Sequence, residues 1–402
     1  MVIKEFETFV VGNPPPRFGG RYFIFVKLVT DTGIVGYGEV YCATFSAETV
    51  EVMLRDTAER FVVGHDPFHI ERLWRRIYGA GYNLRPDVSL VSVLSALEMA
   101  CWDIVGKACD KPVYELLGGK VHERLRSYTY IYPSSGDVYP EPGDTDNVYV
   151  NPDRAAQRAL DYVKQGFTAV KFDPAGPYTI FDGGMPTGQE LDRSEKFTRR
   201  IREAVGPDVD LLFGTHGQFS PAGAIRLAKR LEPYDPLWFE EPTPPENTGA
   251  MARVARATSI PVATGERLCT KYEFARVLED GAASILQLNL GRVGGLLEAK
   301  KIAALAEVHY AQLAPHMYCG PIVGAANIQL ATCSPNFLIL EGIETWGGFQ
   351  AELLNTPVMW EAGYVIPSTE PGLGVSLNEA VARANPWRGD ELHLEMGVEP
   401  VR

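Results

Sequence analysis

The chain has 402 residues, enough for two domains or for one large barrel with an appended module. Hydrophobic residues make up 46% of it and charged residues 22%, an ordinary mix for a soluble globular protein. The net charge of −13 argues against nucleic acid as a partner, although a small anionic substrate responds only to the charge of its own pocket.

The first part of the chain has an α+β pattern. Strands are predicted over residues 2–11 and within 21–41, where "DTG" supplies the turn between two strands. Amphipathic or apolar helical patterns follow over 47–63, 69–81 and 90–119. The Pro/Gly-rich stretch 12–21, "GNPPPRFGGR", fits either a mobile flap or a long connection.

From about residue 126 short apolar strands alternate with amphipathic helices. In "SPAGAIRLAKRLEP", for example, Ser220 is placed to cap a helix whose first turn contains Pro221. Eight strand candidates are "RSYTYIY", "TAVKFD", "VDLLFGTH", "PLWFEEP", "IPVATGE", "ASILQLN", "AQLAPH" and "NFLILEG". Polar residues end six of them at positions 216, 240, 266, 289, 316 and 341, about one βα unit apart each time.

Eight strands with seven crossovers favour a (β/α) barrel over an open sheet. We predict an α+β domain over 1–125, the barrel over 126–358, and a tail over 359–402 that returns to the first domain. A longer loop follows the second barrel strand, after Asp173.

The carboxyl ends of the strands form the active-site face of such a barrel, so polar residues there have a chemical interpretation. Glu240 and Glu266 on neighbouring strand ends would repel each other when buried, unless a cation such as Mg²⁺ lies between them. The competing interpretation is an ion pair of Glu266 with Arg267. Glu241 should point away from the pocket because side chains alternate along a strand.

Two further strand ends carry groups suited to proton transfer. His316 shares the rim with two acids and a lysine, which favours an acid/base role over a packed structural histidine. Lys171 could bind a substrate carboxylate, act as a base if its pKa falls near a metal, or simply extend from a strand end.

The six cysteines, at 42, 101, 109, 269, 319 and 333, are scattered without a CxxC pair and indicate free thiols in a reducing compartment. The amino-terminal residues lack a secretory signal pattern, and no apolar run approaches membrane length. The prediction is a cytoplasmic protein with no membrane partner.

Several motifs in order, "ALEMACWDIVGKACDKPVYELLGG", "VKFD", "FEEP", "TGERL", "RVGG", "APH" and "PGLGV", resemble the enolase superfamily. Within it the chain is most similar to the mandelate racemase subgroup and its galactonate- and mannonate-type acid-sugar dehydratases. The resemblance implies a modified TIM barrel of the (β/α)7β type under an α+β capping domain built from both termini. It further implies loops such as 12–21 and 79–84 that close the site, and a multimer. It also implies that Mg²⁺ polarises the substrate carboxylate while a base removes the α-proton to give an enediolate.

Carried over by position, the resemblance makes Glu240 and Glu266 the second and third metal ligands. It makes His316 the base, with Asn289 behind it and Glu341 as the acid of the eighth strand. Lys171 matches the first lysine of the family's KxK motif, and Asp173 replaces the second. His216 matches the histidine that protonates the departing hydroxyl in the galactonate type.

Two positions depart from the family pattern. Gly214 stands where the family has the first ligand aspartate, and Asn289 stands where it has an aspartate that raises the basicity of the histidine. Asp173 or His216 could supply the missing ligand, with oxygen favouring Asp173; water could fill the vacancy; or the site could have lost its metal. We predict that Gly214 opens room for a changed ligand set while His216 is kept for proton transfer.

The functional prediction is a Mg²⁺-dependent sugar-acid dehydratase in which His316 or Lys171 removes the α-proton and His216 protonates the leaving hydroxyl. One alternative is a racemase, epimerase or cycloisomerase that uses Lys171 and His316 on opposite faces. Another is a barrel that binds a sugar acid without turnover. The sequence leaves the particular sugar acid open.

Overall fold

The computed structural model describes residues 1–82, 84–139, 144–176 and 183–394. It begins with an antiparallel three-stranded sheet in the order β1-β2-β3, formed by β1 (Ile3–Gly12), β2 (Tyr22–Thr30) and β3 (Val35–Val40). The predicted turn lies between β2 and β3, where Gly33 has a φ of 82° that glycine adopts without strain.

Four helices accompany this sheet: α1 (Ala47–Phe61), α2 (Ile70–Tyr78), α3 (Val88–Ala108) and the short α4 (Val113–Leu116), with a 3₁₀ turn η1 (Ala80–Tyr82). The sequence predicted one helix over 90–119, but Asp110 has a φ of 52° and Pro112 follows, so the helix breaks there. Helix α3 packs tightly on β3, because a Cβ at Gly38 would lie 2.0 Å from the carbonyl oxygen of Ala96.

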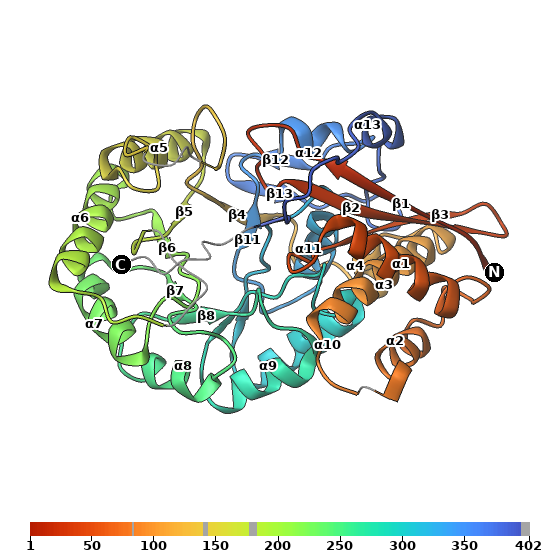
Figure 1. Cartoon of the computed structure of the whole chain (residues 1–402), viewed down its shortest axis with the longest axis horizontal. Coiled ribbons are helices and arrows are strands. Elements are labelled where there is room, and N and C mark those ends of the chain that lie inside the picture. Colours follow the sequence, from red (N-terminus) through yellow and green to blue (C-terminus); the bar gives the residue numbers. More distant parts are fainter. Residues whose placement is uncertain (83, 140–143, 177–182, 395–402) are drawn as a thin grey trace.

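The second unit is a closed barrel of eight parallel strands (Figure 1). Its strands are β4 (Leu125–Tyr130), β5 (Ala169–Phe172), β6 (Asp210–Phe213), β7 (Trp238–Glu240), β8 (Val262–Thr264), β9 (Ile285–Leu286), β10 (Gln312–Leu313) and β11 (Leu340–Gly342). Strands β4 to β10 pair in sequence order, and β11 pairs with β4. A parallel bridge links Leu313 of β10 to Phe337, three residues before β11.

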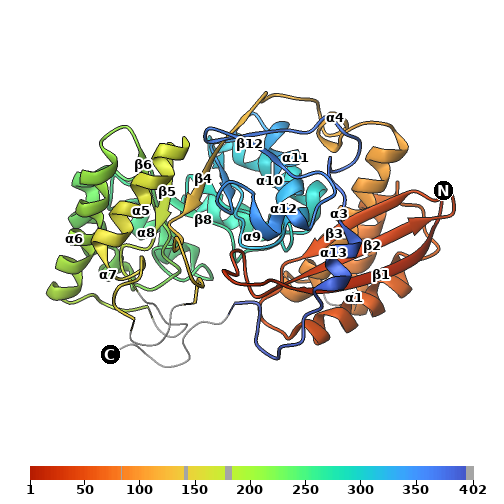
Figure 2. The ribbon, with the colours of Figure 1, turned by 90° about the horizontal axis from the view of Figure 1, so that it is seen from above.

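In the described part of the chain, seven helices connect these strands; they lie around the outside of the barrel in Figure 1 and are seen from above in Figure 2. They are α5 (Pro152–Gln165), α6 (Gly188–Val205), α7 (Pro221–Leu231, followed by η2, Glu232–Tyr234), α8 (Thr248–Ala255), α9 (Thr270–Glu279), α10 (Gly295–Val308) and α11 (Pro321–Thr332). The predicted cap of α7 is present, since Ser220 Oγ accepts a hydrogen bond from the amide of Gly223 at 3.2 Å. The prediction of a (β/α)7β barrel with an α+β cap is confirmed.

The last part of the described chain contains α12 (Gly348–Glu352), β12 (Met359–Glu361), β13 (Tyr364–Ile366) and α13 (Glu379–Ala384). Strand β13 pairs antiparallel with β4 of the barrel. Farther on, the amide of Gly12 donates to Asn385 O at 2.8 Å, and the amide of Trp387 donates to Val10 O at 3.0 Å. The tail therefore contacts both units, and the domain boundaries at 125 and 358 stay predictions.

Two buried carboxylates attach the capping unit to the barrel. Glu39 of β3 accepts hydrogen bonds from the amides of Ile322 (3.1 Å) and Val323 (2.9 Å) at the start of α11. Glu98 of α3 accepts from the amide of Leu296 (2.8 Å) at the start of α10. Because these helix starts follow the carboxyl ends of β9 and β10, the capping unit lies against the active-site face of the barrel.

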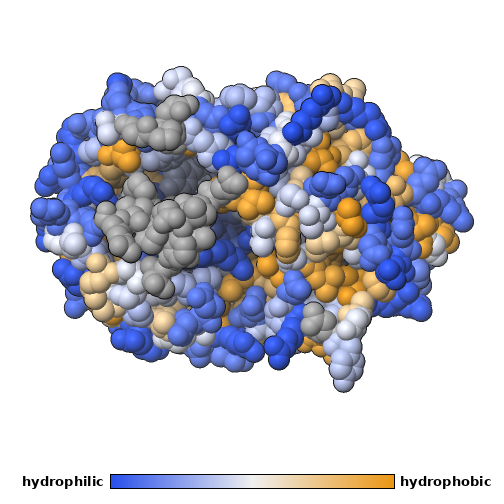
Figure 3. All heavy atoms as spheres, viewed as in Figure 1, coloured by the Kyte–Doolittle hydropathy of each residue, from blue (hydrophilic) through white to orange (hydrophobic). Residues whose placement is uncertain are grey.

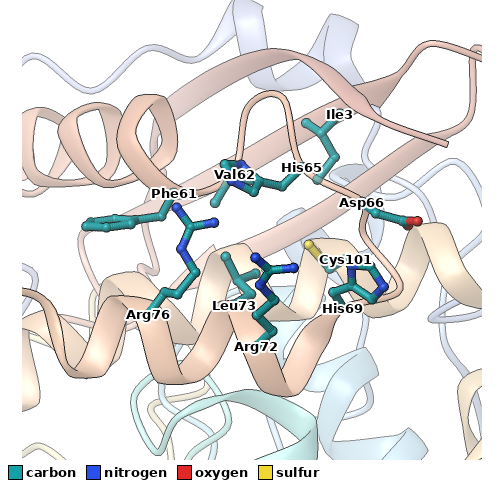
Figure 4. A pocket seen from close by; sticks show the side chains of 10 residues that line it. All are labelled: Ile3, Phe61, Val62, His65, Asp66, His69, Arg72, Leu73, Arg76 and Cys101. Atoms are coloured by element: carbon teal, nitrogen blue, oxygen red, sulfur yellow. The ribbon is translucent and has the colours of Figure 1, made fainter.

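Other features of the capping unit concern packing. A small hollow between α1 and α2 has a volume of about 30 Å³, room for little more than one water molecule (Figure 4).

Helix α3 is long and apolar enough by composition to cross a membrane, which was not expected from the sequence. However, 78% of its most apolar window is buried inside the protein.

Candidate functional site

The polar residues predicted at the strand ends gather at the carboxyl end of the barrel. Lys171, Glu240, Glu266, Asn289, His316 and Glu341 are all buried, and His216 is partly buried. They form two contacting groups, one around Lys171 and one around Glu266. Such an accumulation of buried charge needs close compensation within the site.

Lys171 supplies that compensation for two of the acids. Its Nζ lies 2.8 Å from Glu240 Oε1 and 3.3 Å from Glu341 Oε1. Burial alone would lower the pKa of Lys171, but these two carboxylates outweigh it and raise the pKa well above its usual value. The lysine is therefore an ammonium ion, and it has no lone pair with which to accept a proton in this state.

Each of these acids also accepts hydrogen bonds on its other oxygen. Glu240 Oε2 accepts from Gln287 Nε2 at 2.6 Å and from Trp238 Nε1 at 3.2 Å. Glu341 Oε2 accepts from the amide of Met317 at 2.8 Å. Gln287 and Trp238 were not among the residues predicted from the sequence, although each lies two residues before a predicted site residue and so on the same strand face.

Gly214 lies directly beneath the Lys171 side chain. A Cβ on Gly214 would stand 2.6 Å from Lys171 Cε and 3.2 Å from Tyr130 Cε2. Its φ is outside the left-handed region, so the backbone itself does not demand glycine. A larger residue at position 214 would require the flexible end of the Lys171 side chain to move, so glycine suits the path that Lys171 takes here.

Glu266 forms the second group with two histidines. His316 Nε2 lies 3.3 Å from Glu266 Oε2, and His216 Nε2 lies 3.9 Å from Glu266 Oε1. Glu266 Oε2 is buried and has no hydrogen-bond partner among the described residues. Ligand atoms of His216, Glu240 and Glu266 all lie within 4.8 Å of one another, a set that could hold a metal ion.

Asp173 was preferred over His216 as the replacement ligand, and the geometry favours His216 instead. Asp173 Oδ2 accepts from Gln218 Nε2 at 2.7 Å, and Oδ1 accepts from the amide of Ala175 at 2.8 Å. Burial raises the pKa of Asp173 to about 7, despite these two donors. Its carboxylate belongs to the loop after β5, and the candidate metal group among the described residues does not include it.

Asn289 contacts the ring of His316 from behind. Asn289 Nδ2 lies 3.0 Å from His316 Nδ1, and the amide of Gly291 donates to Asn289 Oδ1 at 2.8 Å. Burial lowers the pKa of His316, although the neighbouring carboxylates of Glu266 and Glu341 oppose the shift. Burial also lowers the pKa of His216, to about 3. Both rings are therefore neutral near pH 7.

The competing interpretation of Glu266 required an ion pair with Arg267. Arg267 pairs with Glu241 instead. Its Nε donates to Glu241 Oε2 at 2.6 Å, and Thr264 Oγ1 donates to Glu241 Oε1 at 3.3 Å. Glu241 thus points away from the site, as strand alternation predicted. Among the described residues, Glu266 forms no ion pair with a lysine or arginine, and its carboxylate pairs only with the two histidines.

The ring of Tyr41, from the capping unit, packs beside His316. The ring centroid of Tyr41 lies 5.7 Å from that of His316, and the guanidinium of Arg292 stacks 4.0 Å above Tyr41. On the other side, Tyr41 contacts His393 of the tail, with centroids 5.3 Å apart. No sequence pattern pointed to His393, because its position depends on where the tail returns.

Two predicted features lie partly outside the described residues. The loop after Asp173, expected to influence specificity, includes the undescribed residues 177–182, and the loop 79–84 includes residue 83. The loop 12–21 is described and is bound to its surroundings: Val138 N donates to Pro16 O at 3.0 Å, and Arg17 pairs with Asp137 at 3.0 Å. Around this region the visible surface is more hydrophobic over the capping unit than over the barrel helices (Figure 3).

Comparison with known proteins agrees with this geometry. A family model described as mandelate racemase / muconate lactonizing enzyme, N-terminal domain, matches residues 18–118. A second, described as enolase C-terminal domain-like, matches residues 154–381.

Similar proteins span nearly the whole chain. A D-galactonate dehydratase from Ralstonia pickettii (strain 12J) is 36% identical, with 93% of this chain and 94% of that protein covered. A D-gluconate dehydratase from Thermoproteus tenax is 33% identical, with 99% of this chain and 76% of that protein covered. A crystal structure from Labrenzia alexandrii DFL-11, assigned to the mandelate racemase/muconate lactonizing enzymes, is 67% identical with a TM-score of 0.95 and full coverage of both chains.

Proposed function

Because the chain belongs to the mandelate racemase/muconate lactonizing enzyme family of the enolase superfamily, we propose that it is a metal-dependent dehydratase of a sugar acid. Relatives named as D-galactonate and D-gluconate dehydratases support this substrate class. An aldonate or aldarate offers a carboxylate, an acidic α C–H bond and a hydroxyl on the next carbon, which are the groups that dehydration requires.

The observation that carries the proposal is the buried, unsatisfied Glu266 Oε2 beside Glu240 and His216. A buried carboxylate oxygen without a donor is costly, and a divalent cation would satisfy it. Glu240, Glu266 and neutral His216 fit such an ion. We propose Mg²⁺, which prefers carboxylate oxygen, while the imidazole makes Mn²⁺ and Zn²⁺ the natural comparisons. When bound, the ion supplies Lewis-acid polarisation of the substrate carboxylate.

In the proposed reaction the C2–H bond breaks and its proton passes to a base, giving an enediolate. The C3–O bond then breaks, and the hydroxyl leaves with a proton as water. The resulting enol becomes a 2-keto acid. His316 and Lys171 are the candidate bases on this chain, and both lie next to the carboxylates that surround the proposed ion site.

His216 has two candidate roles, metal ligand and acid for the departing hydroxyl. Its Nε2 belongs to the compact group with Glu240 and Glu266, and its lowered pKa leaves the lone pair that a metal ligand needs. We propose the ligand role. His216→Asn should then weaken ion binding measured by calorimetry, whereas unchanged binding with lost turnover would restore the acid role.

A racemase, epimerase or cycloisomerase using the same enediolate is the second candidate, because Lys171 and His316 reach the site from different strands. Incubation in D₂O with a panel of aldonates and aldarates separates the two. Dehydration yields a 2-keto acid, whereas 1,1-proton transfer places deuterium at the α-carbon without a new ketone.

The same panel tests a non-catalytic barrel. Sugar-acid binding that needs no metal and gives no product would replace the enzyme proposal. A cytoplasmic homo-oligomer without nucleic-acid or membrane partners remains the prediction from the sequence.

A further inference from the structure

The orientation of the Asn289 amide is fixed by its neighbours. A backbone N–H can only donate, and Gly291 N–H lies 2.8 Å from Asn289 Oδ1, so the oxygen must face Gly291. The amide NH₂ therefore faces the opposite way, toward His316. Asn289 is fully buried, so no solvent competes for either end of the amide.

The NH₂ group of Asn289 in turn decides which ring nitrogen of His316 carries the proton. Asn289 Nδ2 lies 3.0 Å from His316 Nδ1 and 3.4 Å from His316 O, and an amide nitrogen offers only donors. His316 Nδ1 must then accept, so the neutral ring carries its hydrogen on Nε2. Glu266 Oε2 lies 3.3 Å from that nitrogen, but the two atoms form no hydrogen bond, so this N–H stays available to a substrate oxygen.

We propose that Asn289 makes His316 a neutral hydrogen-bond donor to a substrate oxygen, through Nε2–H, instead of the acceptor of the α-proton. This inference rests on the proposed function for the identity of the substrate, but the tautomer itself does not depend on it. It leaves Lys171 as the candidate proton acceptor, after its ammonium has passed a proton to Glu240 or Glu341, whose oxygens lie 2.8 Å and 3.3 Å away.

Accepting a proton at Nε2 would be unfavourable for a specific reason. The ring would then carry N–H groups at both nitrogens, and Nδ1–H would face the Asn289 NH₂ group across 3.0 Å, donor against donor. Turning the amide over would move this conflict to the Gly291 amide. The charges around the ring are mixed: Glu266 and Glu341 favour the imidazolium, while Lys171, Arg292 and burial oppose it.

A neutral histidine donor is chemically useful here. As charge develops on the substrate carboxylate during α-proton removal, a fixed N–H in a buried site stabilises that oxygen. An aspartate at position 289 would instead accept from Nδ1–H, leave the Nε2 lone pair free and raise the basicity of the ring. The exchange of one carboxylate for an amide therefore reverses the tautomer.

The tautomer can be measured without substrate by ¹⁵N NMR of protein labelled at histidine, with His316→Gln used to assign the ring signals. The wild type should show an unprotonated Nδ1 and a protonated Nε2. In Asn289→Asp the proton should instead be on Nδ1 and Nε2 should be unprotonated, and the ring should titrate at a higher pH. Asn327→Asp is the matched control, because Asn327 Nδ2 contacts only the backbone of the same histidine, at 3.0 Å from His316 O.

A wild-type signal with the proton on Nδ1, or a tautomer unchanged by Asn289→Asp, would overturn the proposal. Failure of the proposed function is distinguishable, since it would appear as no product from any sugar acid while the NMR result stands. With an active substrate, His316→Gln retains an N–H donor and should keep measurable α-proton exchange in D₂O. Complete loss of exchange in that variant would mark His316 as the proton acceptor.

Discussion

Lys171 lies across Gly214, so closely that a Cβ at Gly214 would come within 2.6 Å of Lys171 Cε. The ammonium at the end of this side chain is bound by Glu240, the acid that the family pattern assigns to a metal. Gly214 thus lacks the carboxylate that the family pattern has at this position, and Lys171 brings a positive charge to the acids that are present.

Gly214→Asp should return a carboxylate to the site and displace Lys171. We expect a lower melting temperature without metal, because a fourth acid joins the buried Glu240, Glu266 and Glu341. We also expect Mg²⁺ affinity to rise about tenfold or more, which corresponds to about 1.4 kcal/mol. Differential scanning fluorimetry with and without Mg²⁺ measures both effects.

Gly188→Asp is the control for that experiment, since a Cβ at Gly188 would meet no atom within 4 Å. It adds the same charge on open surface and should leave Mg²⁺ stabilisation unchanged. Equal responses from the two variants would mean that Gly214 has no connection with the ion site.

Lys171→Met should strengthen metal binding, because a fixed ammonium repels a second cation at Glu240. The metal-free protein should lose stability, while the gain in stability on adding Mg²⁺ should exceed that of the wild type. Lys271→Met is a suitable comparison, since Lys271 also pairs with a buried carboxylate, Glu298, at 3.0 Å, but away from the site. A Lys171 variant whose Mg²⁺ affinity falls would show that the lysine supports the ion.

The sequence was sufficient to predict the barrel because apolar strands, capped helices and polar strand ends recur with one spacing along the chain. The same regularity located Glu240, Glu266, His316 and Glu341, since alternation along a short strand fixes which side chains face the site. Gly214 and Asn289 were visible as departures because the motifs around them are intact.

The consequences of those departures depend on tertiary packing, which has no sequence period. Contacts between different strands determine the path of Lys171 over Gly214 and the hydrogen bond from Gln218 to Asp173. They also determine that His216, and not Asp173, groups with Glu240 and Glu266. The prediction of one long helix over 90–119 was wrong for a local reason. The break at Asp110 requires a positive φ, which helical spacing does not reveal.

His393 should make the protein sensitive to acid. Its ring is buried against Tyr22, Tyr41 and Tyr318, and burial lowers its pKa to about 3, whereas an unfolded histidine has a pKa of 6.5. Between these two pH values the unfolded state binds a proton at this histidine and the folded state does not. The free energy of unfolding therefore falls as pH decreases from about 6.5 toward 3. The slope from this residue is about 1.4 kcal/mol per pH unit at most.

His393→Phe should keep the aromatic packing and remove this residue's contribution to the dependence of the free energy of unfolding on pH. Urea unfolding at pH 7, 6, 5 and 4 measures that dependence. The two site histidines, whose pKa values are also lowered, leave some acid sensitivity in the variant. An exposed histidine, His309, provides the comparison through His309→Phe. A slope identical in wild type and His393→Phe would contradict the assignment.

The central claim is that Glu240 and Glu266 hold a divalent cation needed to break the C–H bond next to a sugar-acid carboxylate. The most direct measurement is the rate of 2-keto acid formation from D-galactonate and D-gluconate as Mg²⁺ is titrated into chelator-treated wild type, Glu240→Gln and Glu266→Gln. We expect the wild type to require the ion and each variant to lose at least about 10³-fold in rate at every Mg²⁺ concentration. Variants that turn over substrate and respond to Mg²⁺ as the wild type does would contradict the account.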